Sequence, residues 1–93
     1  MDSLVLDIGG DIGALLIHTG AEFAEQEIEI SPAGVEVAHR AHNVVHLRRD
    51  GDRSAYTAVF PTVEAGDYTV WQHDGSPHAV ITIRGGEVTE HHM

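Results

Sequence analysis

Short apolar or alternating runs, each bounded by turn residues, follow one another along almost the whole chain. No segment keeps an apolar period of about 3.6 residues; the nearest, residues 33–45, follows Pro32 and contains Gly34 and several valines, which argues against a long helix. Such a pattern is typical of an all-β sandwich or barrel. It predicts one domain, residues 1–93, with seven antiparallel strands over residues 12–18, 25–31, 42–49, 53–60, 66–73, 78–84 and 86–92.

The second of these strands has the clearest alternation. One face carries Gln26, Ile28 and Ile30 and the other carries Glu25, Glu27 and Glu29. The apolar face is expected to join the core. The three carboxylates predict a solvated edge that blocks pairing with other molecules, and a metal or basic-partner site is the alternative.

The third and fourth strands are expected to form a hairpin through Asp50-Gly51, a favoured two-residue turn. That turn would place Arg48 opposite Arg53, and a slightly longer loop through Arg49 to Arg53 is the alternative. In both versions the same residues face the core: Val45, Leu47, Tyr56, Ala58 and Phe60.

Two further hairpins are predicted in the C-terminal third. A four-residue loop over residues 74–77 would place His73 opposite His78 and pair Thr69 with Thr82 and Trp71 with Val80. The core face would then carry Tyr68, Val70, Ile81 and Ile83.

The second C-terminal hairpin is expected to turn at Gly85-Gly86. Its ladder would pair Thr82 with Thr89 and Val80 with His91.

The run Phe60-Pro61-x-Val63-x-Ala65-Gly66-Asp67-Tyr68-Thr69-Val70, followed by Ile81-Thr82-Ile83-x-Gly85-Gly86-Glu87-Val88-Thr89, resembles the end of prealbumin-like sandwich domains. These include carboxypeptidase regulatory-like and collagen-adhesin B-type modules. The resemblance covers residues 60–89 and implies a seven-stranded prealbumin-like sandwich that serves as a binding or structural module. The isopeptide-forming lysine of some adhesin modules has no counterpart, because the chain contains no lysine.

Charge narrows the range of partners. The formal net charge is −10, with five arginines as the only Lys or Arg residues. Such a surface repels phosphate backbones and anionic lipids, so neither nucleic acid nor a membrane is an expected partner. The acidic start and the short apolar run over residues 12–17 predict neither a signal peptide nor a membrane span. A cytoplasmic protein of a bacterium is expected.

Histidine is the most conspicuous candidate for chemistry, with eight in 93 residues, and without cysteine any metal site must use His, Asp or Glu. The predicted ladder places His73 and His78 with Cβ atoms about 4.5–5.5 Å apart and His91 about 7–8 Å from His78. Three imidazoles suit zinc, or copper or nickel with less constraint, and Asp74 or Glu90 could add a ligand. Binding is expected to weaken below about pH 6, since protons compete for the ring nitrogens.

Other interpretations of these histidines stay open. His73 and His78 could be surface residues that flank a hairpin, His91 and His92 could belong to a frayed terminus, and the group could form a pH-sensitive interface. A second group, His39, His42 and His46, would chelate on a helix but spreads too far along a strand. His18 is expected to be a hydrogen-bonded core residue or a strand-end surface residue.

Trp71 and Val80 are expected side by side on the face opposite the core, as an oligomer or ligand contact. The alternative is that the chain's own loop over residues 61–66 or 31–42 covers Trp71. No nucleophile motif is present, and a sandwich of this size seldom contains a cleft. The sequence therefore favours a small acidic binding module over an enzyme, and predicts that the module binds a metal through His73, His78 and His91. The alternatives are a metal-free homo-oligomer with a possible protein partner and a small zinc-dependent hydrolase or hydratase.

Overall fold

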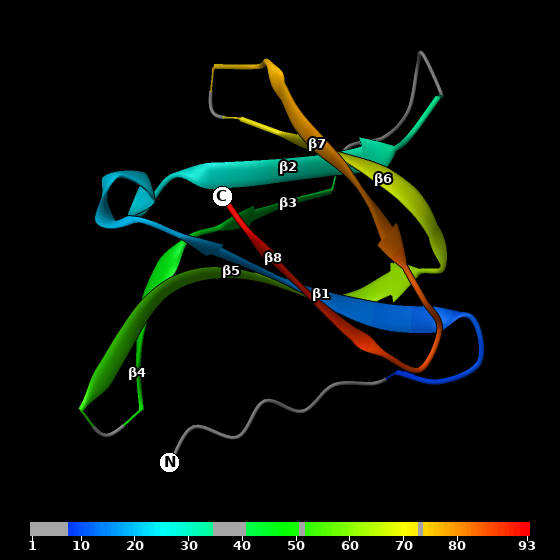
Figure 1. The fold of residues 1–93 in the computed structure, drawn as a ribbon, viewed down its shortest axis with the longest axis horizontal. Coiled ribbons are helices and arrows are strands. Elements are labelled where there is room, and N and C mark those ends of the chain that lie inside the picture. The colour runs from blue at the N-terminus through cyan, green and yellow to red at the C-terminus, as the bar shows by residue number, and fades with distance from the viewer. Residues whose placement is uncertain (1–7, 35–40, 51, 73) are drawn as a thin grey trace.

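A computed structural model describes residues 8–34, 41–50, 52–72 and 74–93. In these residues the protein is an all-β, sandwich-like fold of two four-stranded sheets (Figure 1). The strands are β1 (Ile12–Thr19), β2 (Glu27–Pro32), β3 (Ala41–Val44), β4 (His46–Asp50), β5 (Arg53–Glu64), β6 (Gly66–Trp71), β7 (Pro77–Ile83) and β8 (Val88–His92), with a short 3₁₀ helix η1 (Ala21–Phe23). The order is β4-β5-β1-β8 in one sheet, here the β1 sheet, and β3-β2-β6-β7 in the other, the β2 sheet. No helix within this part of the chain is long and apolar enough to cross a membrane.

The expected seven strands are wrong, because the predicted strand 42–49 is two strands in different sheets. Val45 separates β3 from β4 and is fully buried. Its N–H donates to the Gln26 carbonyl and its carbonyl accepts from the Glu25 N–H, both at 2.9 Å. These bonds satisfy the backbone at the point where the chain leaves one sheet for the other, so the break leaves no buried polar group unpaired.

The predicted hairpin at Gly85-Gly86 does not form, and the prediction that all strands are antiparallel is wrong. The strand β8 joins the β1 sheet and runs parallel to β1, whereas β7 stays in the β2 sheet (Figure 1). The connection is held by two bonds to β1: the Gly86 N–H donates to the Ile12 carbonyl at 2.9 Å, and the Ala14 N–H to the Glu87 carbonyl at 3.0 Å. The predicted Val80–His91 and Thr82–Thr89 pairs therefore do not form.

Strands β6 and β7 form the predicted hairpin, but in a register two residues away from the predicted one. Tyr68 lies opposite Ile81 and Thr69 opposite Val80. The ladder ends at the Trp71–Pro77 pair, so the loop is longer than predicted. Within it, Asp74 accepts bonds from the Ser76 N–H at 2.9 Å and the Ser76 hydroxyl at 2.6 Å. Because side chains alternate with a period of two, this shift keeps the predicted faces of Tyr68–Val70 and Ala79–Ile83, whereas His78 lies at a register shift and does not keep its predicted face.

The β4–β5 hairpin is likewise present with a different register. Asp50 lies opposite Arg53, and Arg48 lies opposite Ala55 instead of another arginine. Gly51 lies outside the described residues. This register removes the unfavourable arginine pair that the shorter-loop alignment implied.

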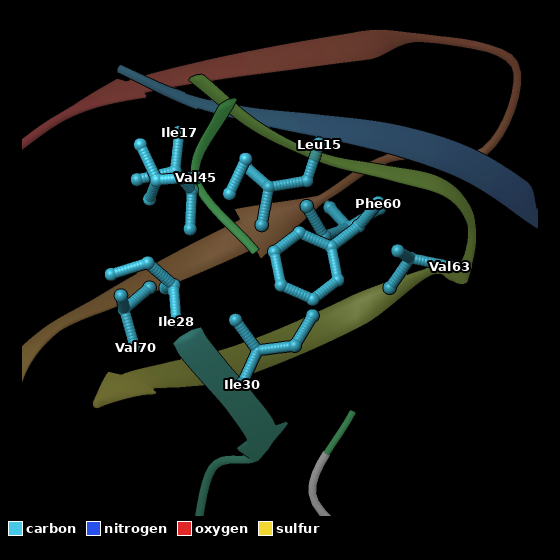
Figure 2. Packing of buried hydrophobic residues seen from close by; sticks show 10 residues of the cluster. Leu15, Ile17, Ile28, Ile30, Val45, Phe60, Val63 and Val70 are labelled. Atoms are coloured by element: carbon cyan, nitrogen blue, oxygen red, sulfur yellow. The ribbon is translucent and has the colours of Figure 1, made fainter. Parts of the chain in front are cut away.

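The core lies between the two sheets (Figure 2). Val45, Ala58 and Phe60 are buried as predicted, and Tyr56 packs against them. Four further core residues come from the predicted apolar faces of other strands: Ile28, Ile30, Val70 and Ile83. Leu15, Ile17 and Val63 also belong to the core, although no face was predicted for them. Leu47 is 41% exposed, so its assignment to the core was wrong; it sits on β4, the edge strand of its sheet.

Tyr68 gives a pH-dependent prediction for this fold. Its hydroxyl donates to the Glu64 carbonyl at 2.7 Å. Burial, followed by the charge of Glu64, raises the pKa of Tyr68 above 10.0. Because the unfolded chain loses this proton first, the resulting stabilisation should be complete below pH 10 and lost as the pH rises through the pKa of the folded protein. Ultraviolet titration of a Tyr56→Phe variant, in which Tyr68 is the last tyrosine, should show a midpoint that falls when the chain is unfolded in urea. Equal midpoints would contradict the burial of Tyr68.

Candidate functional site

His78 and His91 come together from the two sheets. His91 lies beside Ile17 in the parallel β1–β8 ladder, on the face turned towards the other sheet. The ring of His78, from β7, meets the His91 ring edge to face, with centroids 5.2 Å apart. The pair therefore links β7 and β8, each of which is the last strand of its sheet.

A β-bulge positions His78. Val70 pairs with Ala79 and Trp71 with Pro77, so His78 is an extra residue between two consecutive partners. A bulge of this kind bends the strand and turns the side chain away from its regular direction. This explains how a residue of the β2 sheet contacts a residue that extends from the β1 sheet.

His91 has a ring nitrogen that lacks a hydrogen-bond partner within the described structure. Its Nε2 atom is buried and accepts or donates no bond there. Burial lowers the pKa of His91 below its usual value, and the nearby His78 and His92 lower the pKa further. The ring is therefore biased towards the neutral form, which is the form that binds a metal ion.

The described structure does not place the other expected ligands, His73, Asp74 and Glu90, beside the His78–His91 pair. His73 lies outside the described residues. The Asp74 carboxylate closes its own loop through Ser76, and Glu90 binds His18 on the opposite face of β8. In the described part of the chain no group of three or more His, Cys, Asp or Glu side chains could hold a metal ion.

A second histidine group lies on the outer face of the β1 sheet. The Nδ1 atom of His18 lies 3.1 Å from the hydroxyl of the buried Thr57, and its Nε2 atom lies 2.9 Å from a Glu90 carboxylate oxygen. The His92 ring stacks on His18 with centroids 4.8 Å apart. In the neutral ring Nε2 donates to the carboxylate and Nδ1 accepts from Thr57. His18 is hydrogen-bonded, but it lies near the end of β1 on the outer face, so the strand-end alternative is confirmed and the core alternative is wrong.

Sequence reasoning missed that group because its members come from three strands. His18 and Glu90 are 72 residues apart. The only available signal was the alternation of β8, which places Glu90 and His92 on one face and His91 on the other.

The remaining histidines and acidic residues are dispersed. His42 belongs to β3 and His46 to β4, in different sheets, and His39 lies outside the described residues. His46 lies 3.8 Å from Glu25, which precedes β2 in a turn with φ of 65°. The predicted acidic edge is wrong, because β2 lies between β3 and β6 and is an inner strand.

Trp71 and Val80 lie on the outer face of the β2 sheet, in neighbouring rows of the β6–β7 ladder. Trp71 lies opposite Pro77, and Val80 opposite Thr69. The Trp71 indole N–H donates to the Ser31 hydroxyl at 2.8 Å. Val80 is 63% exposed. The predicted direct pair is absent, but both side chains stay on the predicted face.

No family model matches the chain, and neither a curated protein nor a solved structure matches it.

Proposed function

We propose that this protein is a small binding module that holds a transition-metal ion on His78 and His91. The observation that supports this proposal is the buried, unpaired Nε2 atom of His91 beside the His78 ring. A buried polar atom without a partner costs about 1–3 kcal/mol, and a metal ion would satisfy it. Two imidazoles on one tetrahedral zinc ion, with Zn–N bonds of about 2.0–2.1 Å, have ring centroids about 5 Å apart. The 5.2 Å between these rings fits that geometry.

Zinc is the first choice of metal. Imidazole ligands without thiolates suit zinc, copper and nickel, and the tetrahedral fit favours zinc. In a site made by one chain, the third ligand would be His73, which precedes His78 by five residues in the sequence. A water molecule on an open coordination position would permit hydrolysis or hydration, which remains the less favoured extension of the proposal.

The metal site predicts the following binding results. Zinc added to chelator-treated protein should bind in a saturable manner by native mass spectrometry and calorimetry. His78→Ala and His91→Ala should each weaken binding by roughly 100-fold or more, since loss of a direct ligand exceeds the 10–100-fold effect of losing an outer-shell partner.

The matched control is His42→Ala, which removes an exposed histidine from the β2 sheet, the sheet that also contains His78. It should bind zinc like the unaltered protein. If both His78→Ala and His91→Ala retained the original affinity, the ion would be held elsewhere or not at all, and the proposed site would be wrong.

A metal-free interaction protein is the second candidate. It is favoured by the exposed Val80 beside Trp71, whose N–H is satisfied within the sheet, so that another molecule could cover the apolar part of this face without leaving that donor unpaired. The same native spectra decide between the candidates, because an oligomer that persists after chelation and contains no metal supports the second.

We also propose that the sandwich is prealbumin-like. The arrangement of two four-stranded sheets supports this, and so does the course of residues 60–71, which end β5 in one sheet and form β6 in the other. An experimental structure tests the assignment through the order of the strands.

A further inference from the structure

The His78–His91 pair lies on an open side of the sandwich. Strand β7 is an edge strand of the β2 sheet and β8 is an edge strand of the β1 sheet, so neither has a neighbouring strand on its outer side within the described fold. The pair supplies two imidazoles, and the described residues supply no further ligand to it. A closed zinc site needs four ligands, so an ion held by this pair would take two ligands from elsewhere.

The strand that carries His78 is uncharged. The sequence of β7 is Pro-His-Ala-Val-Ile-Thr-Ile, in a chain that contains 15 acidic residues and has a formal net charge of −10. Two copies of such a chain repel one another over most of their surfaces. The side chains of β7 add no charge to that repulsion, and Val80, two residues after His78, is 63% exposed.

Strand extension is a poor way to join two copies here. Pro77 begins β7 and has no N–H to donate to a new ladder, and the bulge at His78 twists the same end of the strand. A contact at this end must therefore be made by side chains.

Building on the proposed metal binding, we propose that a second copy of this chain completes the site. In a two-fold dimer the same surface of each copy meets the other, so a pair of histidines becomes a set of four. His78 and His91 of each copy would then surround one zinc ion on the symmetry axis, with Val80 of each copy covered beside it. The metal ion brings positive charge to the place where two anionic molecules meet, so dimerisation depends on the metal.

The test is a zinc titration of the chelator-treated full chain, followed by sedimentation and native mass spectrometry. We expect a monomer without zinc and a dimer with zinc, at one ion per two chains. His78→Ala should remain monomeric at zinc concentrations that convert the unaltered protein to dimer.

Val80→Glu separates metal binding from assembly, because it leaves both histidines in place and adds an acidic group to each side of the contact. It should weaken the zinc-dependent dimer at least tenfold. Leu47→Glu adds the same charge to an exposed apolar position on β4, at the opposite edge of the β1 sheet, and should dimerise normally. Circular dichroism confirms that both variants are folded.

The outcomes separate the two proposals. A monomer that binds one ion per chain through His78 and His91 would overturn the dimer and leave the metal-binding function intact. Absence of zinc binding would overturn both. A dimer that forms equally well in chelator, or that Val80→Glu leaves unchanged, would overturn the shared site.

Discussion

Replacing Phe60 with alanine is expected to lower the free energy of unfolding by about 3–5 kcal/mol. The Phe60 side chain is 4% exposed and belongs to the core cluster with Leu15, Ile30 and Val63 (Figure 2). These neighbours come from both sheets and are held by their own ladders, so they can close only part of the space left by the ring. The transition can be followed in urea by the fluorescence of Trp71, the single tryptophan of the chain.

Two further variants keep this prediction testable even if Phe60→Ala does not fold. Phe60→Leu removes less volume and should lose about 1–2 kcal/mol. Val80→Ala, at a position that is 63% exposed, should change stability by no more than about 0.5 kcal/mol. A loss for Phe60→Ala as small as that for Val80→Ala would show that Phe60 does not lie in the core.

The distribution of core and surface positions could be predicted because alternation is a local property. Ile28 and Ile30 are buried, and Val70 and Ile83 face the core as expected. The predicted register of the β6–β7 hairpin was wrong by two residues, which changed the partners of Val70 and Ile83 but not the faces on which they lie. Leu47 failed because alternation indicates a face and does not indicate whether the opposite sheet extends far enough to cover it.

The assignment of strands to sheets could not be predicted in the same way. Nothing in the pattern of residues 42–49 marks Val45 as the point where the chain changes sheets, because bonds to Glu25 and Gln26 replace a ladder there. The Gly85-Gly86 pair is a genuine local hairpin signal. In the structure β8 pairs with β1 instead. The two strands are far apart in sequence, and nothing in the pattern of either segment indicates that they pair.

The candidate site was predicted in part, and for a different reason from the one that the structure gives. His78 and His91 were expected on one ladder, as diagonal neighbours. They meet instead between two sheets, through a bulge and a change of sheet that the sequence pattern does not contain. The resemblance to prealbumin-like domains, which covers residues 60–89, concerned the fold and did not bear on this pair.

Replacing Gly85 with alanine is expected to destabilise the protein by about 3 kcal/mol and to disturb the metal site as well. A Cβ atom at Gly85 would collide with the carbonyl group of Gly10 and approach the Asp11 backbone to 3.0 Å. Both obstacles are backbone, so relief requires the connection between β7 and β8 to move away from the turn before β1. That movement would strain the bonds from Gly86 to Ile12 and from Ala14 to Glu87, which lead β8 into its place beside β1.

The neighbouring glycine is the matched control for that collision. Gly86 has a φ of 75°, and a Cβ atom there would meet nothing within 4 Å, so Gly86→Ala should cost only the backbone strain of about 1–2 kcal/mol. Urea unfolding should therefore rank Gly85→Ala below Gly86→Ala in stability. Zinc affinity should follow the same order, because His91 depends on the position of β8. If Gly86→Ala were the more damaging change, the close packing of the β7–β8 connection against Gly10 would be wrong, and with it the explanation of how His91 reaches His78.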